Sequence, residues 1–176
     1  RDYPGSVNSP TRGVFAGGAD YPSFYNTIDF ITIASQGINA SDFGDMSAVH
    51  GGNNNGGGGN AVRGIFHVGN TYSNTLEFIT IATTGNSQDF GDLINTSRNG
   101  NGGVSNGHRG IVMGGYSSPA RTNTIQYVTI QSTGNAIDFG DLTDARDPAV
   151  TSSLTRGIAC TGDYPSNVNI IDFIEI

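Results

Sequence analysis

The sequence Asp-Phe-Gly-Asp occurs three times in this chain, at positions 42–45, 89–92 and 138–141. Its Phe residues, Phe43, Phe90 and Phe139, lie 47 and 49 residues apart. A protein kinase carries an Asp-Phe-Gly triplet once, together with a Gly-rich nucleotide loop, a strand Lys and a His-Arg-Asp loop. This chain has no Lys and no His-Arg-Asp sequence, so the triplet is here the mark of an internal repeat.

Two further markers keep the same period. An Arg-Gly pair begins an apolar run four times, with spacings of 51, 46 and 47 residues, at Arg12, Arg63, Arg109 and Arg156. An Asn-led octet rich in β-branched and aromatic residues follows each pair, beginning at Asn26, Asn74, Asn123 and Asn169. A period of 46 to 51 residues fits a four-stranded blade of a β-propeller.

A complete unit contains four candidate strands, in the order small-residue strand, Arg-Gly strand, Asn-led strand and Asp-Phe-Gly-Asp strand. We therefore predict a single all-β domain over 1–176, with blades at about 1–46, 47–93, 94–142 and 143–176. The first three blades are complete, and the fourth lacks its Asp-Phe-Gly-Asp strand. In the complete blades we expect the Phe of this motif to be buried between blades and its Gly to permit a bulge or a close approach of backbone. The alternatives are a small four-bladed ring with a short last blade, or part of a larger ring completed by missing chain or by another copy. In either case the exposed edge of the last blade needs cover.

This strand order resembles the kelch repeat, in which a strand ending in Gly-Gly precedes a Tyr-Asp strand and a Trp strand. Gly17-Gly18 and Gly114-Gly115 match the double Gly, and the repeated Phe residues stand where kelch has Trp. The sequence around "DFGDL" also resembles repeats in virion structural and fibre-like proteins of tailed phages, especially those of cyanobacteria. This second resemblance implies a location on a virion or an extracellular surface. The implied partners are other virion or surface proteins, or a host glycan or receptor.

Composition narrows the partners. The net charge of −7 and the pI of about 4.5 disfavour nucleic acid, because phosphate binding needs a basic face. The sequence has no run of 18 apolar residues, so we expect no membrane span. We expect no cofactor either.

The loops predict where recognition lies. The links between third and fourth strands hardly vary among repeats, which indicates a structural turn with Gly at a positive φ. The links between second and third strands vary in length, yet each contains a tyrosine at its centre or start: Tyr21, Tyr72, Tyr116 and Tyr164. Variable loops on a rigid scaffold usually carry binding residues, so these four are the candidate ligand-binding residues. The alternative is that each Tyr only fastens its loop to the blade.

Other motifs receive structural interpretations. His50, His67 and His108 occupy different repeat positions, so we predict no metal site. Kelch-like copper oxidases use a Cys-linked Tyr with two His, which Cys160 and scattered His residues support poorly. The Gly/Asn-rich segment 51–60 lacks the Lys of a phosphate loop. It is expected at the innermost strand, either because side-chain room is small near the axis or because it forms a flexible loop between blades. The matching recurrence of Arg and Asp predicts an Arg-to-Asp contact repeated around the ring.

Two classes of function remain. The first is a non-enzymatic structural or adhesive module, a phage fibre or decoration component that binds protein or glycan through its variable loops. The alternative is a propeller-type enzyme acting on glycans. Enzymes break repeat symmetry with unique acids, bases or ligands, whereas most acidic residues here are borne by the repeat, which favours the first class.

Overall fold

The computed structural model describes residues 1–37, 39–50, 58–68, 72–97, 102–162 and 166–176. These residues form an all-β chain of antiparallel strands, and no helix occurs among them. Four successive sheets follow the four sequence repeats, and we number them in chain order. The all-β class predicted from the sequence is confirmed, but the described strands do not form a closed propeller.

The strands of sheets 1 and 2 follow the predicted order from innermost to outermost. Sheet 1 contains β1 (Gly5–Asn8), β2 (Arg12–Ala16), β3 (Ala19–Asp20), β4 (Ser23–Thr32) and β5 (Ser41–His50), with the order β1-β2-β4-β5 and β3 paired to β4. Sheet 2 contains β6 (Gly58–Gly59), β7 (Arg63–His67), β8 (Ser73–Thr80) and β9 (Gln88–Ser97), in that order.

Sheet 3 repeats this arrangement and adds a hairpin, while sheet 4 is shorter. Sheet 3 contains β10 (Gly102–Ser105), β11 (Arg109–Met113), β14 (Thr124–Thr129) and β15 (Ile137–Asp141), and the hairpin is formed by β12 (Tyr116–Ser117) and β13 (Ala120–Arg121). Sheet 4 has three strands, β16 (Ala149–Ser152), β17 (Arg156–Cys160) and β18 (Ile171–Glu175). The outer strands β5 and β9 run four residues past the predicted blade ends at 46 and 93.

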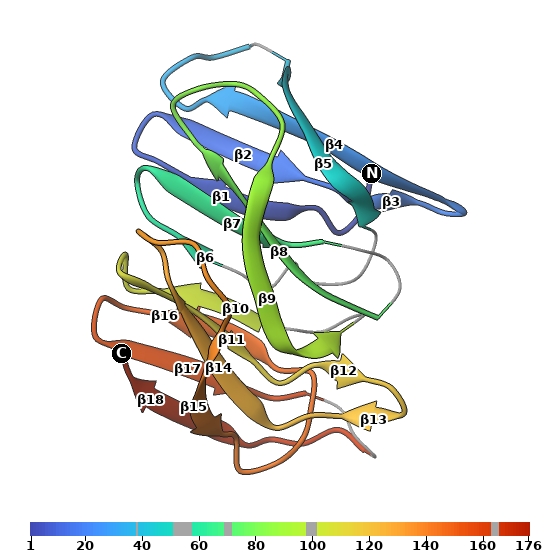
Figure 1. Cartoon of the computed structure of the whole chain (residues 1–176), viewed down its shortest axis with the longest axis vertical. Coiled ribbons are helices and arrows are strands. Elements are labelled where there is room, and N and C mark those ends of the chain that lie inside the picture. Colours follow the sequence, from blue (N-terminus) through green and yellow to red (C-terminus); the bar gives the residue numbers. More distant parts are fainter. Residues whose placement is uncertain (38, 51–57, 69–71, 98–101, 163–165) are drawn as a thin grey trace.

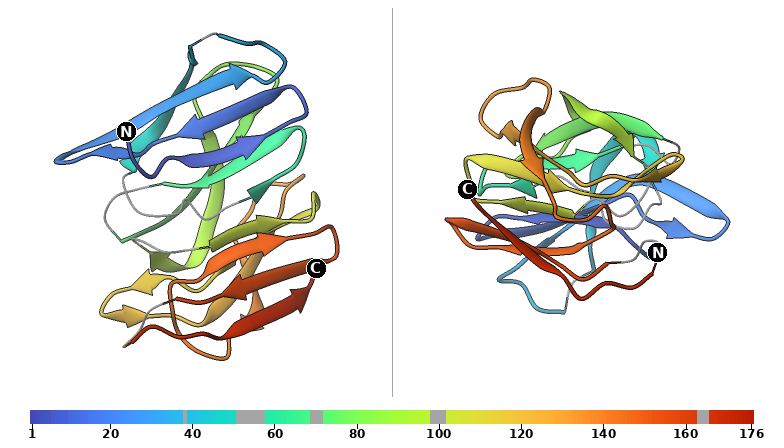
Figure 2. Two further views of the ribbon diagram at one scale, coloured as in Figure 1. Left: turned by 180° about the vertical axis from the view of Figure 1, so that it is seen from behind. Right: turned by 90° about the horizontal axis from the view of Figure 1, so that it is seen from below.

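The sheets follow one another through the molecule in chain order, from blue at one end to red at the other (Figure 1), and the view from behind shows the same succession (Figure 2). Contacts between innermost strands join β1 to β6, β6 to β10 and β10 to β16. All four innermost strands line one open cavity of about 330 Å³. Residues 51–57 of the Gly/Asn-rich segment lie outside the described residues. At its described end the predicted crowding is present, since a Cβ on Gly58 would lie 2.9 Å from the carbonyl oxygen of Val104.

The Asp-Phe-Gly-Asp strand contains a β-bulge that aims its Phe into the core. In sheet 1, Ile28 pairs with Gly44 and Asp29 pairs with Asp42, which leaves Phe43 as the extra residue on β5. The same register shift leaves Phe90 extra on β9 and Phe139 extra on β15. Each bulged Phe lies edge-on to the aromatic residue of the neighbouring strand, with ring centroids 5.9 to 6.0 Å apart.

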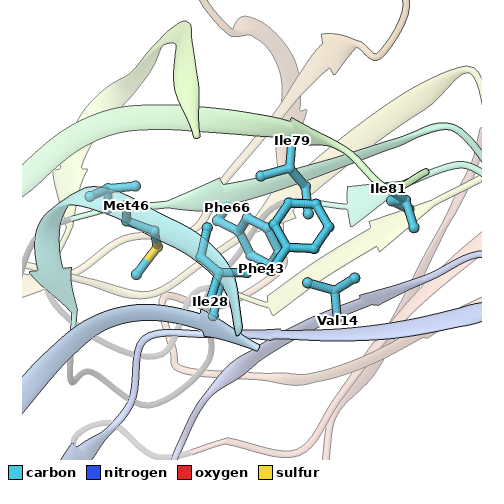
Figure 3. Close-up of a cluster of buried hydrophobic side chains, with 9 residues drawn as sticks. Val14, Ile28, Phe43, Met46, Phe66, Ile79 and Ile81 are labelled. Carbon is cyan, nitrogen blue, oxygen red and sulfur yellow. The ribbon is translucent and has the colours of Figure 1, made fainter. Parts of the chain in front are cut away.

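Apolar side chains fill the space between successive sheets (Figure 3). Between sheets 1 and 2, Ile28 and Phe43 meet Phe66 and Ile79, all of them buried. A second cluster joins sheet 2 to sheet 3 around Phe90, and a third joins sheet 3 to sheet 4. Phe43 and Phe90 are buried, whereas Phe139 is only half-buried.

The nearly invariant turn of one sheet docks on the bulge of the sheet before it. The amide of Gly85 donates to the carbonyl of Phe43 at 2.7 Å, and the amide of Gly134 donates in the same way to Phe90. The bulge Gly makes this approach possible, because a Cβ on Gly91 would lie 2.4 Å from the carbonyl oxygen of Gly134. Both turn glycines have a positive φ, as predicted.

A polar link repeats at each junction between successive sheets. The backbone amide of Ser47 donates to the carboxylate of Glu77 in the next sheet at 3.1 Å, and Ile94 donates to the Gln126 side chain at 2.7 Å. Glu77 and Gln126 are buried, so these hydrogen bonds satisfy groups that would otherwise be costly to bury. The third link pairs Thr143 with Asp172.

Candidate binding surface

The tyrosines predicted to bind a ligand lie in the variable loops, and their exposure and neighbours differ. Tyr21 lies in the tight connection between β3 and β4 and is 88 % exposed. Tyr72 precedes β8, and Tyr116 begins the β12–β13 hairpin. Tyr164 lies outside the described residues. The β3–β4 and β12–β13 hairpins project from the same side of the molecule (Figures 1 and 2).

Tyr72 and Tyr116 come together although 44 residues separate them in the sequence. Their ring centroids are 5.9 Å apart and their planes are tilted by 44°. Hydrogen bonding to Tyr72 is the main cause that raises the pKa of the Tyr116 phenol. The two rings belong to loops of neighbouring sheets, so the aromatic pair spans the boundary between sheets 2 and 3. The structure does not bring Tyr21 into this pair.

A guanidinium group lies beside the aromatic pair. The Arg121 guanidinium carbon is 5.2 Å from the centre of the Tyr116 ring, a distance at which a cation is attracted to the ring face. Asp147 forms an ion pair with this guanidinium, with its carboxylate oxygen 3.1 Å from Nη2. Tyr72, Tyr116, Arg121 and Asp147 form what we call the tyrosine patch.

The tyrosine patch has the properties of a binding surface. Tyr72 is 40 % exposed, and Tyr116, Arg121 and Asp147 are half-buried. Paired aromatic rings offer rigid apolar area at low entropy cost, and the phenol and guanidinium groups add hydrogen-bond donors at its border. This combination suits a ligand with one apolar face and several hydroxyl or carboxylate groups.

The sequence alone assigned no role to Arg121 or Asp147. The available signal was that Arg121 stands outside the four Arg-Gly pairs, in a loop that also contains a predicted Tyr. The pairing of the two loops could not be found from spacing, because it depends on the path of the β12–β13 hairpin.

The predicted Arg-to-Asp contact is wrong for the described residues, where the four repeated Arg side chains form no ion pair with the Asp-Phe-Gly-Asp carboxylates. Each guanidinium instead stacks on an aromatic ring of its own sheet, 4.6 to 4.7 Å from the ring centre, at Phe30, Phe78, Tyr127 and Phe173. The strand order gives the reason: the Asn-led strand lies between the Arg-Gly strand and the Asp-Phe-Gly-Asp strand.

Arg12 and Arg63 also bridge two sheets. Arg12 donates to the carbonyl of Ile81 at 2.9 Å, and Arg63 donates to the carbonyl of Ile130 at 3.1 Å. Arg109 and Arg156 are exposed. The repeated Arg residues therefore belong to the scaffold.

Two of the three His residues meet inside the molecule. His50 and His67 are buried with ring centroids 5.5 Å apart, and the Nε2 atom of His67 lies 2.8 Å from the carbonyl oxygen of Ser73. Burial lowers the pKa of His67, so its ring is neutral at physiological pH. Among the described residues, no three His, Cys, Asp or Glu side chains gather in a way that could hold a metal ion.

No family model matches this sequence, and a search of curated proteins found no match. The described part of the chain also contains no helix that is long and apolar enough to cross a membrane.

Proposed function

We propose that this chain is a segment of a kelch-like β-propeller and that it acts as a non-enzymatic binding module. The propeller interpretation is supported by four consecutive sheets whose innermost strands line one cavity. It is supported further by three bulged Phe strands at equivalent positions. In this account the sheets are blades, and the loops between second and third strands form the recognition side.

The observation that carries the binding role is the tyrosine patch. It joins two neighbouring blades on the side where loop length varies, and it combines paired aromatic rings with a fixed guanidinium. Aromatic faces stack on the apolar faces of sugar rings, while phenol and guanidinium groups can bond sugar hydroxyls. We therefore propose a glycan as the ligand class. The placement on a phage virion rests on the resemblance of the repeats and stays a prediction.

A glycan array tests this proposal with the full chain as the probe. We expect binding to a subset of glycans, and we expect the double variant Tyr72→Ala/Tyr116→Ala to lose it by about tenfold or more. Tyr3→Ala is the matched control, because Tyr3 is an exposed tyrosine outside the variable loops. An array on which the chain and the double variant behave alike would show that the patch is not the glycan site.

The same experiment distinguishes a binding module from an enzyme that acts on glycans. A glycosidase needs two carboxyl groups that flank the scissile bond, one as acid and one as base or nucleophile. In the tyrosine patch, Asp147 is engaged with Arg121. We expect the bound glycans to be recovered uncleaved after prolonged incubation, and release of shorter saccharides would favour the enzyme.

A further inference from the structure

Sheet 4 differs from the other three sheets in its outer edge. In sheets 1 to 3 the third strand is paired on both sides, with the Asp-Phe-Gly-Asp strand on its outer side. In the described chain, β18 pairs with β17 alone and presents its other backbone edge. An unpaired edge strand is a template for another extended segment.

The side chains of β18 are those of a covered strand. Ile171 occupies the repeat position of Ile28, Leu76 and Ile125, which are all buried, yet Ile171 is 68 % exposed. Phe173 is 61 % exposed, whereas the equivalent Phe78 is buried and the equivalent Phe30 and Tyr127 are half-buried. In the other sheets the equivalent aromatic ring meets the bulged Phe of the outer strand edge-on.

The bulge of β15 in sheet 3, which precedes this edge, is also uncovered by the described residues. The bulges at Phe43 and Phe90 each accept a hydrogen bond from the turn of the next sheet. At the third bulge the described residues supply no such turn: a Cβ on Gly140 would meet nothing within 4 Å. At the earlier junctions, the turn of the next sheet covers the bulge, and the strand after that turn pairs with the third strand of its sheet. Among the described residues, the corresponding positions at the bulge of β15 and the edge of β18 are both open.

We propose that this place binds an extended segment with a Gly-Asn turn followed by an Asp-Phe-Gly-Asp-Leu strand. The three internal copies define this chemistry. The Gly of the segment would lie opposite Ile171 and its first Asp opposite Asp172, as in the registers of β4 with β5 and of β8 with β9. Its Phe would bulge inward against Phe173. A folded second copy cannot supply the strand, because its own three are already paired.

The binding mode is addition of a strand to a sheet edge. Backbone hydrogen bonds along β18 would give affinity, and the Phe side chain would give specificity by covering Ile171 and Phe173. The turn would donate to the carbonyl of Phe139 as the Gly85 turn does to Phe43. Since this surface shares no residue with the tyrosine patch, the two proposals stand or fall separately.

The test uses a labelled synthetic peptide with the sequence of residues 84–95 of this chain, TGNSQDFGDLIN. We expect saturable binding to the full chain by fluorescence anisotropy at peptide concentrations up to about 1 mM. A peptide with Ala in place of its Phe should bind at least about tenfold more weakly, and Ile171→Lys in the chain should have the same effect. Hydrogen exchange should slow along β18 when the peptide is bound.

Leu154→Lys is the matched control in the chain. Leu154 is 78 % exposed and lies in sheet 4 between β16 and β17, away from the edge, so its substitution should leave peptide binding unchanged. Absence of saturable binding would overturn the proposal. Binding that Ile171→Lys leaves intact would overturn it equally, and so would self-association of the chain that Ile171→Lys abolishes without any peptide binding.

Discussion

The same sequence motif lies at the junction between sheets 2 and 3 and at the junction between sheets 3 and 4. The two copies of the motif are covered to different extents. At the first, the bulge at Phe90 receives the turn containing Gly134, and the Phe is 1 % exposed. At the second, the described residues supply no turn, and Phe139 stays half-buried. The burial of a repeated residue therefore depends on the neighbouring sheet as much as on its own sheet.

The second junction compensates with a residue that is not repeated. Arg146 is fully buried and donates to the carbonyls of Thr161 and Ala159 and to the carboxylate of Asp172. It follows β15 at the repeat position that His50 occupies after the bulge of β5. Burial opposes ionisation of Asp172, but hydrogen bonds from Arg146 and Thr143 outweigh it and lower the pKa of this carboxyl.

The largest expected difference between the two junctions concerns the bulged Phe residues. Phe90→Ala should lower the free energy of unfolding by about 3 to 5 kcal/mol, because it removes a buried ring and leaves a cavity. Phe139→Ala should cost clearly less, because its ring is already partly in water. Urea denaturation measures both. Equal losses would mean that the two junctions bury their Phe residues alike, contrary to the comparison.

Arg146→Ala tests the junction between sheets 3 and 4. This substitution should lower the free energy of unfolding by about 3 kcal/mol, because it leaves the Asp172 carboxylate and several carbonyl groups without their hydrogen-bond donor. Arg156→Ala is the control: Arg156 is exposed and stacks on an exposed Phe173, so its loss should stay within about 1 kcal/mol. Two losses of similar size in urea denaturation would show that Arg146 does not hold sheet 4.

A smaller effect should distinguish the first junction by its pH dependence. The pKa of His67 is lowered in the folded state, so below its ordinary value of about 6.5 the unfolded chain takes up the proton first. Stability is therefore complete above that pH and falls as the pH drops toward the folded pKa. The free energy of unfolding at about pH 7.5 and 5.5 measures this loss, which His67→Gln should reduce and His108→Gln, at an exposed site, should not.

Much of the fold could be predicted from the sequence, because the repeat encodes it locally. The period set the four strands of each unit, and the Gly of Asp-Phe-Gly-Asp indicated a bulge or a close approach of backbone, both of which occur. The expected burial of the repeated Phe residues holds fully for Phe43 and Phe90 and only in part for Phe139. That difference arises from the neighbouring sheet, which the local repeat does not describe.

The remaining features depend on contacts between segments that share no pattern. The repeated Arg and Asp residues match in number, but strand order separates them, and aromatic rings lie nearer to the guanidinium groups. The pairing of Tyr72 with Tyr116 depends on two loops of different length. Arg146 is buried by its neighbours in sheet 4, and a single occurrence gives no periodic signal.

The central claim is that the Asp-Phe-Gly-Asp bulge of one sheet holds the turn of the next. Gly91→Ala and Gly140→Ala test it most directly, because both glycines occupy the same motif with φ of 140° and 138°. Both variants share a backbone cost of about 1 to 3 kcal/mol, because a φ near 140° is readily adopted by glycine alone. In Gly91→Ala the new Cβ would also press on the Gly134 backbone, whereas at Gly140 it would meet open space. We therefore predict that Gly91→Ala lowers the free energy of unfolding by about 1 to 3 kcal/mol more than Gly140→Ala, and equal losses would contradict the account.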